Sequence, residues 1–471
     1  MAAPVRSSWG MRSFRLSSMR LGADRAASLL GSGLLLCGFA LVGCDTSTLP
    51  EGYVGFVTAP GDDPWSIEPA ASHVRLDFVQ DTTRSTLADV GAPPDAISLG
   101  NGGPSDVVAH FEVTGLTSSD DAVVSGVSVP FYVQGFAGAY VPLFVGRKGG
   151  FSLAPTPLSF AHAHPLSAIG SASYLFVVGS GDAKIDIYDA ATWGGSSQTT
   201  LPQTVKSMAV AGTLLLIVND DSAVWIDRTS SLTTPAKAPA GLAFADIVGG
   251  QTLVASDRTI YIVGATRTEG DATNQVLEID PDGTLHTLLL KTPRLGAAAT
   301  LVEDALLVAG GSAQGSGAEL RAVGADGFSA LDFPADETVG AGLVELTSNT
   351  ALLVGGHDAS GAPSSTRTLD LGCSSECTAS GLPSVDVNVR RVGAFMLDQN
   401  VALVVGETDD EQTHAYLFDA SGDEPTLTEQ NLRTPRARAS AARLPNGQIA
   451  IVGGTELSTG NAALGLDVFF P

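Results

Sequence analysis

The sequence predicts an all-β protein, and three observations support this fold class. An apolar strand that ends at a glycine or another turn-forming residue occurs seven times in the second two-thirds of the chain. The 54 glycines and 25 prolines supply many turns, and charged residues, 16% of 471, lack the excess typical of a disordered chain. No stretch after the first 43 residues has a convincing helical pattern. We therefore expect a folded, turn-rich body built from strands.

The seven apolar strands repeat at a spacing that suits a β-propeller. They begin at Tyr174, Leu214, Ile260, Leu306, Leu352, Leu403 and Ile449. The glycines that end them, or the residues that take their place, stand at positions 179, 219, 264, 310, 355, 406 and 453 and are 40 to 51 residues apart. Since a four-stranded propeller blade takes roughly 40 to 50 residues, the spacing predicts seven blades.

Each repeat has the layout of such a blade. A tight turn precedes the glycine-terminated strand, as at Ala211-Gly212 and Asn446-Gly447, and supplies the positive φ that a hairpin needs. A third strand follows and ends near an aspartate such as Asp189 or Asp227, and a more polar fourth strand then often ends at a proline.

The last repeat lacks a fourth strand, and a strand before the first repeat can supply it. Residues 466–470 have the pattern of a third strand, whereas residues 151–157 look like a fourth strand without a blade of its own. We expect the two segments to pair, because this closes the ring and removes two open sheet edges. The 321 residues from 151 to 471 then divide into seven blades of about 46 residues each.

Two short motifs in these repeats resemble those of the kelch family. Gly-Gly ends the second strand at residues 310–311, 355–356 and 453–454, and Thr-Pro-Arg leads into the next blade at residues 292–294 and 434–436. The resemblance covers roughly residues 151–471 and implies a β-propeller of four-stranded blades. The chain departs from the family pattern in lacking the regular Tyr and Trp residues of the later strands.

The segment before the repeats predicts a tether followed by a small β-sandwich-like domain. Residues 44–65 are rich in Thr, Ser, Gly and Asp and are expected to form the tether. Residues 66–150 are expected to form the domain, with strands in the alternating stretches 74–80, 107–116, 123–134 and 140–145.

The N-terminal 43 residues have the three-part layout of a secretory signal peptide. Five arginines precede an apolar run at residues 29–42, which is too short to span a bilayer that needs roughly 20 helical residues. Leu41-Val42-Gly43-Cys44 resembles the lipobox of bacterial lipoproteins, in which the cysteine receives a diacylglycerol and becomes the new N-terminus. The resemblance implies a membrane-anchored protein of the bacterial cell envelope, lipidated at Cys44 and facing the periplasm or the cell surface. An ordinary signal peptide with an incidental cysteine is the alternative.

The charge balance excludes one class of partner. Fifty acidic against 25 basic residues give a formal net charge of -25. Such a chain repels a phosphate backbone, so we do not expect it to bind nucleic acid.

Few residues suggest chemistry on their own. Cys373 and Cys377 predict a local disulfide, because an exported chain meets an oxidising compartment and no further ligands for zinc stand nearby. His162 and His164 could hold a metal from one side of an extended strand, although a solvated loop is the simpler interpretation. Adjacent acids such as Asp409-Asp410 favour solvated turns over calcium sites. We expect no catalytic residue, metal or cofactor from these patterns.

Arginines near the first strands of several blades form a candidate ligand face at one mouth of the ring, where they would bind an anion. They are Arg294, Arg390, Arg391, Arg436 and Arg438. The alternative is that these arginines form buried salt bridges between blades.

The sequence thus favours a lipid-anchored extracytoplasmic binding or scaffolding protein that recognises an envelope protein or glycan through propeller loops. The alternative is a propeller-based glycan-active enzyme, a hydrolase or lyase, with acidic residues at the central channel. A cluster of Asp, Glu, His and Arg that converges at one mouth would favour the enzyme, and a flat or apolar patch would favour the binder. The ligand, the membrane leaflet and the oligomeric state stay open.

Overall fold

The computed structural model describes residues 52–99, 107–132, 139–170, 173–180, 183–198, 200–265 and 271–471. These residues belong to one compact unit of β-strands, in which the helical elements η3 (Phe244–Asp246) and η4 (Pro383–Val385) are single 3-10 turns. The all-β prediction is confirmed. Among the described residues, no helix has the length and apolar character to cross a membrane. The predicted signal peptide and Cys44 lie outside the described residues.

Seven four-stranded antiparallel sheets make up most of the described chain. The first four consist of β11 (Pro165–Ile169), β12 (Tyr174–Gly179), β13 (Ile185–Asp189) and β14 (Gly194–Gln198); β15 (Ser207–Ala211), β16 (Leu214–Val218), β17 (Ala223–Asp227) and β18 (Thr233–Ala236); β19 (Gln251–Val254), β20 (Ile260–Val263), β21 (Thr273–Ile279) and β22 (Leu285–Arg294); and β23 (Ala298–Val302), β24 (Ala305–Ala309), β25 (Ala318–Arg321) and β26 (Ser329–Ala330).

The other three sheets follow in chain order. They consist of β27 (Gly342–Thr347), β28 (Thr350–Val354), β29 (Arg367–Asp370) and β30 (Ser380–Gly381); β31 (Arg390–Asp398), β32 (Val401–Glu407), β33 (Thr413–Asp419) and β34 (Thr426–Gln430); and β36 (Ser440–Arg443), β37 (Ile449–Val452), β39 (Asp467–Phe470) and β10 (Gly150–Leu153).

The second strand of each sheet is one of the seven apolar repeats that the sequence predicts. Leu-Leu-Leu-Ile-Val in β16 and Ile-Tyr-Ile-Val in β20 are typical, and every residue from Leu175 to Val178 in β12 is completely buried. A continuous apolar run, rather than an alternating one, marks a strand that is covered on both faces. Each second strand is therefore covered on both faces of its sheet.

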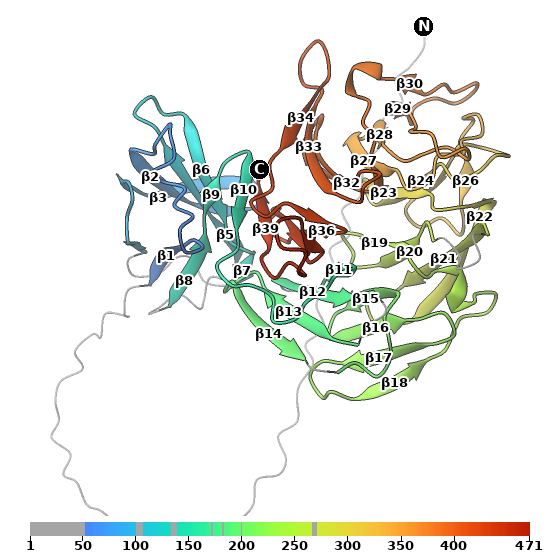
Figure 1. Cartoon of the computed structure of the whole chain (residues 1–471), viewed down its shortest axis with the longest axis horizontal. Coiled ribbons are helices and arrows are strands. Elements are labelled where there is room, and N and C mark those ends of the chain that lie inside the picture. The colour runs from blue at the N-terminus through green and yellow to red at the C-terminus, as the bar shows by residue number, and fades with distance from the viewer. Residues whose placement is uncertain are drawn as a thin grey trace, which may run out of the picture. The chain divides into compact units, whose positions relative to one another are not determined.

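Contacts between the first strands give the order of the sheets. β11 contacts β15, β19 contacts β23, β23 contacts β27 and β27 contacts β31, while β15 contacts β20. β31 also contacts β36, and β36 contacts β11. Figure 1 shows the sheets following one another around a common centre in chain order, with β36 beside β11. This is the arrangement of a β-propeller.

The final sheet combines strands from two distant parts of the sequence. β10 pairs antiparallel with β39, with Gly150 opposite Phe470 and Leu153 opposite Asp467. β10 begins one residue before the segment 151–157 for which the sequence predicts a pairing and ends at Leu153. Two further backbone bonds, from Ala154 N to Leu466 O and from Leu158 N to Leu464 O, extend the contact.

Two further sheets precede the propeller and share one core. β4 (Ala96–Ser98), β1 (Tyr53–Val57) and β8 (Tyr140–Phe144) form one sheet, and β3 (Thr83–Gly91), β2 (His73–Gln80), β5 (Val108–Leu116), β6 (Ala122–Val127) and β9 (Gly146–Arg147) form the other, with β7 (Phe131–Tyr132) paired to β5. Val54 and Leu143 from the first sheet pack with Leu76, Phe111 and Val124 from the second.

The structure corrects the predicted boundary of the tether. Residues 44–65 were expected to be a linker, but residues 53–57 form β1, whose neighbours β4 and β8 cover both of its edges. Trp65 and Asp62 are also buried. β1 is a short strand, Tyr-Val-Gly-Phe-Val, set among polar and turn-forming residues, and its parallel partner β8 comes more than 80 residues later, so no local pattern indicates the pairing.

These N-terminal sheets contact the first and last sheets of the propeller. The ring of Phe144 packs against Trp193 and Phe470, with centroids 4.4 and 4.9 Å away. The Asp62 carboxylate accepts hydrogen bonds from Arg433 Nη2 and Leu153 N, each at 3.0 Å. Asp62 of the N-terminal segment is thus hydrogen-bonded to β10, through Leu153, and to Arg433, which precedes the final sheet.

Two of the five candidate arginines serve the fold. Arg294, the last residue of β22, is buried and its Nη2 lies 3.0 Å from Glu319 of the next sheet. Arg436, in β35 (Arg436–Ala437), which pairs with β38 (Thr455–Glu456), is completely buried beside Asp467. Both guanidinium groups also donate to the carbonyl after a second strand, Gly310 O and Gly453 O. Their assignment to a ligand face is wrong, and buried salt bridges hold them instead.

We predict that Arg436→Met lowers the free energy of unfolding by about 3 to 5 kcal/mol, because it leaves the Asp467 carboxylate buried without its cation. Urea unfolding followed by tryptophan fluorescence measures the change. Arg438→Met, two residues further on at a side chain that is 35% exposed, is the matched control and should cost less than about 1 kcal/mol. Equal losses in the two variants would contradict this role of Arg436.

Candidate functional site

The pairing register of the seven sheets defines one equivalent position at the start of each first strand. Each first strand places a residue opposite the one that comes just before the glycine, or its replacement, at positions 179, 219, 264, 310, 355, 406 and 453. These pairs are Leu166 and Val178, Ser207 and Val218, Gln251 and Val263, Ala298 and Ala309, Gly342 and Val354, Gly393 and Val405, and Ser440 and Val452. We call the residues two positions earlier the mouth residues. They are His164, Val205, Gly249, Gly296, Gly340, Arg391 and Arg438.

The mouth residues differ from one side of the propeller to the other. Arg391, Arg438 and His164 belong to three consecutive sheets: Arg391 is the second residue of β31, and Arg438 and His164 precede β36 and β11. Gly249, Gly296 and Gly340 precede three other consecutive first strands. The propeller therefore presents large basic or imidazole side chains on one side of its opening and no side chains on the other.

Two of these side chains stand where the backbone favours glycine. Gly249, Gly296 and Gly340 have φ values of 71°, 52° and 70°, and Arg391 and Arg438 share this left-handed conformation with φ values of 52° and 56°. For a residue with a Cβ atom, the left-handed region costs roughly 1 to 2 kcal/mol. Retained backbone strain of this kind is concentrated at functional sites.

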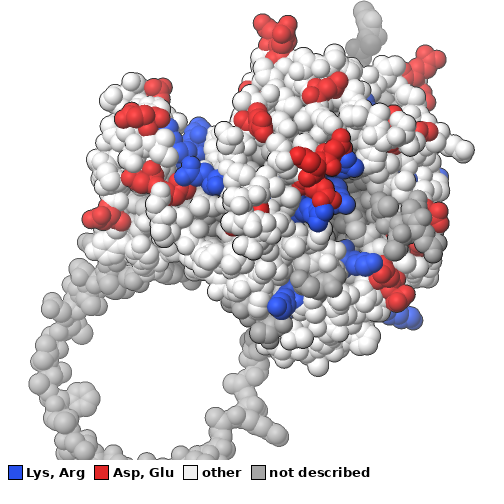
Figure 2. All heavy atoms as spheres, in the orientation of Figure 1, with Lys and Arg blue, Asp and Glu red and all other residues white. Residues whose placement is uncertain are grey.

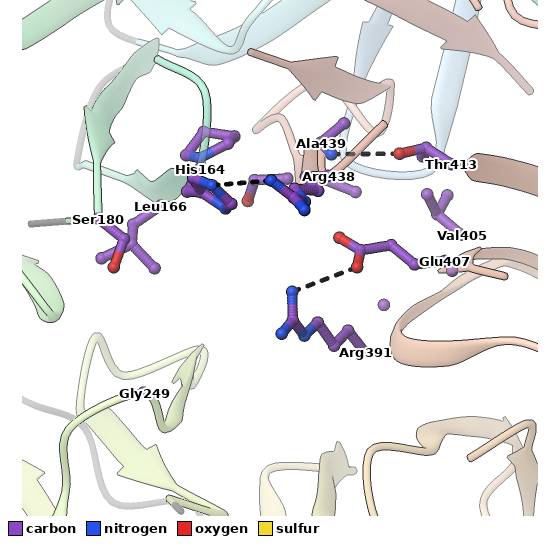
Figure 3. Close-up of a pocket in the computed structure, with 15 residues that line it drawn as sticks. His164, Leu166, Ser180, Gly249, Arg391, Val405, Glu407, Thr413, Arg438 and Ala439 are labelled. Carbon is purple, nitrogen blue, oxygen red and sulfur yellow. Dashed lines mark hydrogen bonds and ion pairs between the residues drawn. The ribbon is translucent and has the colours of Figure 1, made fainter. Parts of the chain in front are cut away.

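A cavity of about 540 Å³ lies beside these side chains. His164, Gly249, Arg391 and Arg438 line it together with Ser180 and Glu407, as Figure 3 shows. In Figure 2, basic and acidic side chains lie directly side by side near the centre of the propeller face. The volume is in the range of small-molecule binding sites, and several polar groups converge on it.

Arg391 forms the first ion pair of the cavity. Its Nη1 atom donates to Glu407 Oε2 at 3.3 Å. The Arg391 side chain is 66% exposed, whereas that of Glu407 is only 8% exposed. Burial raises the pKa of the Glu407 carboxyl, although Arg391 and Arg438 both favour its charged form. Arg391 thus offers an accessible cation above a shielded carboxyl group.

Arg438 connects two groups. Its Nη1 atom lies 3.2 Å from His164 Nε2, and its Nη2 atom pairs with the Glu411 carboxylate. A guanidinium only donates hydrogen bonds, so His164 Nε2 is the acceptor and this contact requires the imidazole proton to lie on Nδ1. Arg438 is 35% and Glu411 47% exposed, so this pair faces solvent.

The carboxylates come from one turn. Residues 407–411, which we call the acidic turn, comprise the last residue of β32 and the turn that follows it toward β33. Glu407 pairs with Arg391, Asp409 with Arg390 and Glu411 with Arg438. Glu411 also has a positive φ, 64°. The acidic turn therefore holds carboxylates against basic groups of two neighbouring sheets.

The structure separates the residues that the sequence grouped together. Arg391 and Arg438 line the cavity, whereas Arg390 pairs with Asp409 and does not line it. Glu407 and Glu411 are functional candidates that sequence reasoning missed. Some mouth residues are glycines and others are arginines, and this difference could have indicated the site. The comparison requires the strand register, because only the register shows which residues are equivalent.

The two histidines are also separated. His162 is buried, and its Nε2 atom lies 3.2 Å from Asp186, which also accepts bonds from Ser159 N and Phe160 N. His164 faces the cavity. Neither interpretation of the histidine pair, a shared metal or a solvated loop, is therefore correct for His162. His162 stands four residues before Leu166, just as Arg294 and Arg436 stand four residues before Ala298 and Ser440 in their sheets.

Cys373 and Cys377 lie at disulfide distance, with their Sγ atoms 2.19 Å and their Cα atoms 5.7 Å apart. Neither lines the cavity. The described residues contain no group of three or more His, Cys, Asp or Glu side chains arranged to hold a metal.

Comparisons with known proteins concern the fold. No protein-family model and no curated protein matches the sequence. The chain is similar to a streptogramin B lyase structure (TM-score 0.40, 13% identity, 68% of this chain and 98% of that chain). It is also similar to the structure of YjhT (0.39, 13%, 67% and 96%) and to the N-terminal domain of Nup159 (0.41, 11%, 68% and 94%). Fold and cavity together define the class as a β-propeller protein with a charged site at its mouth.

We predict that Arg391→Gly leaves the free energy of unfolding unchanged or raises it by up to about 1 kcal/mol. Glycine removes the strain of the left-handed backbone, which outweighs the extra entropy of the unfolded chain and the loss of an exposed ion pair. Chemical unfolding measures the change. Arg391→Ala, which removes the charge and keeps the strain, is the control and should be less stable than Arg391→Gly. If both variants are equally destabilised by more than about 1 kcal/mol, the arginine serves the fold.

Proposed function

We propose that this chain is a lipid-anchored extracytoplasmic binding protein that recognises a small polar group of an envelope protein or glycan at the mouth of a propeller. Export and anchoring follow from the resemblance of residues 1–45 to a lipoprotein signal with its lipobox cysteine, Cys44. We further propose an N-terminal sandwich domain that ends near residue 150 and a kelch-like propeller from residue 151 onward.

We propose that the seven four-stranded sheets are the blades of one closed ring. The pairing of β10 with β39 supports this, since it gives the final sheet its fourth strand, and so does the contact between β36 and β11. Closure of this kind protects the edges of the sheets and brings seven first strands to one opening.

The single observation that carries the binding function is the convergence of Arg391, Arg438, His164 and Glu407 on one cavity. Buried and half-buried polar groups aimed into an accessible hollow are the usual basis of ligand specificity. Two of the four keep a backbone conformation that glycine would adopt at lower cost, which a purely structural role does not require.

A second candidate function is supported by Glu407. A carboxyl group whose pKa is raised by burial, within a cavity that also holds cations, has the properties of a general acid. A glycan-active hydrolase or lyase could use it to protonate a leaving group. The binding protein is preferred because the acidic turn already holds its carboxylates in ion pairs.

We predict that Cys44→Ala abolishes lipidation and membrane association, because the thiol that would receive the diacylglycerol is gone. Intact mass and detergent partitioning of the protein made in a Gram-negative host test this. The wild type should carry a diacylglyceryl mass and enter the detergent phase, and the variant should remain an aqueous or uncleaved precursor. A wild type without lipid would make the protein a freely secreted one.

We predict that Ser180→Trp, which fills the cavity without altering its charges, prevents ligand retention. The immobilised protein is incubated with oligosaccharides and peptides released by digestion of a Gram-negative envelope, and retained compounds are identified by mass spectrometry. The wild type and Ser180→Ala should retain the same compound, and Ser180→Trp should not. Retention by all three proteins would place the site elsewhere, and retention by none of them would refute a small-ligand site.

The same assay separates binding from catalysis. If the wild type converts the retained compound and Glu407→Gln retains it unchanged, the glycan-active enzyme is the correct function. If neither protein converts it, the chain acts as a binding protein.

A further inference from the structure

The proposed function leaves the chemical class of the ligand open, and the charges of the mouth narrow it. The cations are guanidinium groups, and each already binds a carboxylate of this chain, Arg391 that of Glu407 and Arg438 that of Glu411. A guanidinium offers a planar set of N–H donors that matches the two oxygens of a carboxylate. The pairing of both guanidinium groups with Glu407 and Glu411 therefore indicates that they are suited to bind a carboxylate.

Arg391 also has N–H donors that the hydrogen bond to Glu407 does not use. In the part of the chain that the structure describes, the Arg391 guanidinium makes one hydrogen bond, to Glu407, and its side chain is largely exposed to the cavity. Two mouth residues without side chains lie around it: Gly340, whose carbonyl accepts a hydrogen bond from Val392 N at 3.1 Å, and Gly249, which lines the same cavity. A ligand can thus reach Arg391 from the open side without displacing bulky groups.

The two acids of the site differ in how firmly they are held. Glu407 is shielded from solvent at the end of β32, whereas Glu411 lies in the turn, with a left-handed backbone and about half of its side chain exposed. Exposed ion pairs contribute roughly 0 to 1 kcal/mol. An incoming anion can therefore replace Glu411 on Arg438 at little cost, while Glu407 stays in place.

From these observations we propose that the mouth binds the carboxylate of a small ligand between Arg391 and Arg438, and that Glu411 is a built-in competitor which the ligand displaces from Arg438. The inference rests on the proposed function and adds the ligand class and its competitor. A sugar acid of an envelope glycan and the C-terminal carboxylate of a peptide share this chemistry.

Calorimetric titration with two carboxylate probes, galacturonate and N-acetylalanine, tests the proposal. The neutral controls are galacturonate methyl ester and N-acetylalanine amide. We expect at least one carboxylate to bind the wild type and its neutral control to bind at least tenfold more weakly. The probe that binds more tightly identifies the source of the carboxylate.

Variants test the competitor and the cations separately. Glu411→Gln should tighten carboxylate binding about two- to fivefold, because it frees Arg438 from its partner. Arg391→Gly and Arg438→Gly should each weaken it at least tenfold while their thermal unfolding stays at or above that of the wild type. Asp423→Asn, which removes an equal charge from the exposed turn between β33 and β34, is the control and should leave the affinity unchanged.

The outcomes distinguish this inference from the proposed function. Equal binding of the acid and its neutral control, or full binding by Arg391→Gly, would overturn the carboxylate class. No binding of either carboxylate to the wild type and to Glu411→Gln would overturn it as well. In each case retention of an envelope compound by wild type but not by Ser180→Trp would preserve the mouth as a binding site. Unchanged affinity in Glu411→Gln would overturn the competitor alone.

Discussion

The burial of the second strand in every four-stranded sheet is the constraint on which the rest of the structure depends. These strands are apolar along most of their length, and they are removed from water only if both faces of their sheets are covered. The first strands then meet around one centre, and the residues that precede them reach a common opening. A site built from distant parts of the sequence, from His164 to Arg438, follows from this packing.

Arginine has two opposite roles within a few residues of each other. Arg436 is completely buried, donates to Gly453 O and Gly465 O and balances Asp467, so it joins the strands of the final sheet. Arg438, two residues later, is half-buried, with 35% of its side chain exposed, and it lines the cavity. In an extended chain, residues two apart often share a face, but the left-handed backbone at Arg438 changes the course of the chain.

The excess of acidic residues explains why the arginines of the mouth are paired with carboxylates of the same chain. An accessible guanidinium on a chain with 50 acidic residues is readily neutralised by its own carboxylates, and the acidic turn does so at the mouth. Because Glu411 and Arg438 remain in contact with solvent, their attraction is weak compared with that of the buried pairs. The arginines of the mouth are thus paired with carboxylates of this chain, but an anion can displace Glu411 from Arg438 at little cost.

By itself, the sequence determined the all-β class, the seven apolar strands, their spacing and the Cys373 and Cys377 pair. These features depend on local periodicity, on turn residues and on short chain separations, which a sequence displays directly. It also indicated where arginines gather. Only the tertiary structure decided that Arg294 and Arg436 are buried, that His162 and His164 point to different surroundings, and that β1 belongs to a sheet. Those outcomes depend on strand register and on partners far away in the chain, such as Tyr140 for Tyr53 and Asp467 for Arg436, and a one-residue change of register would reverse them.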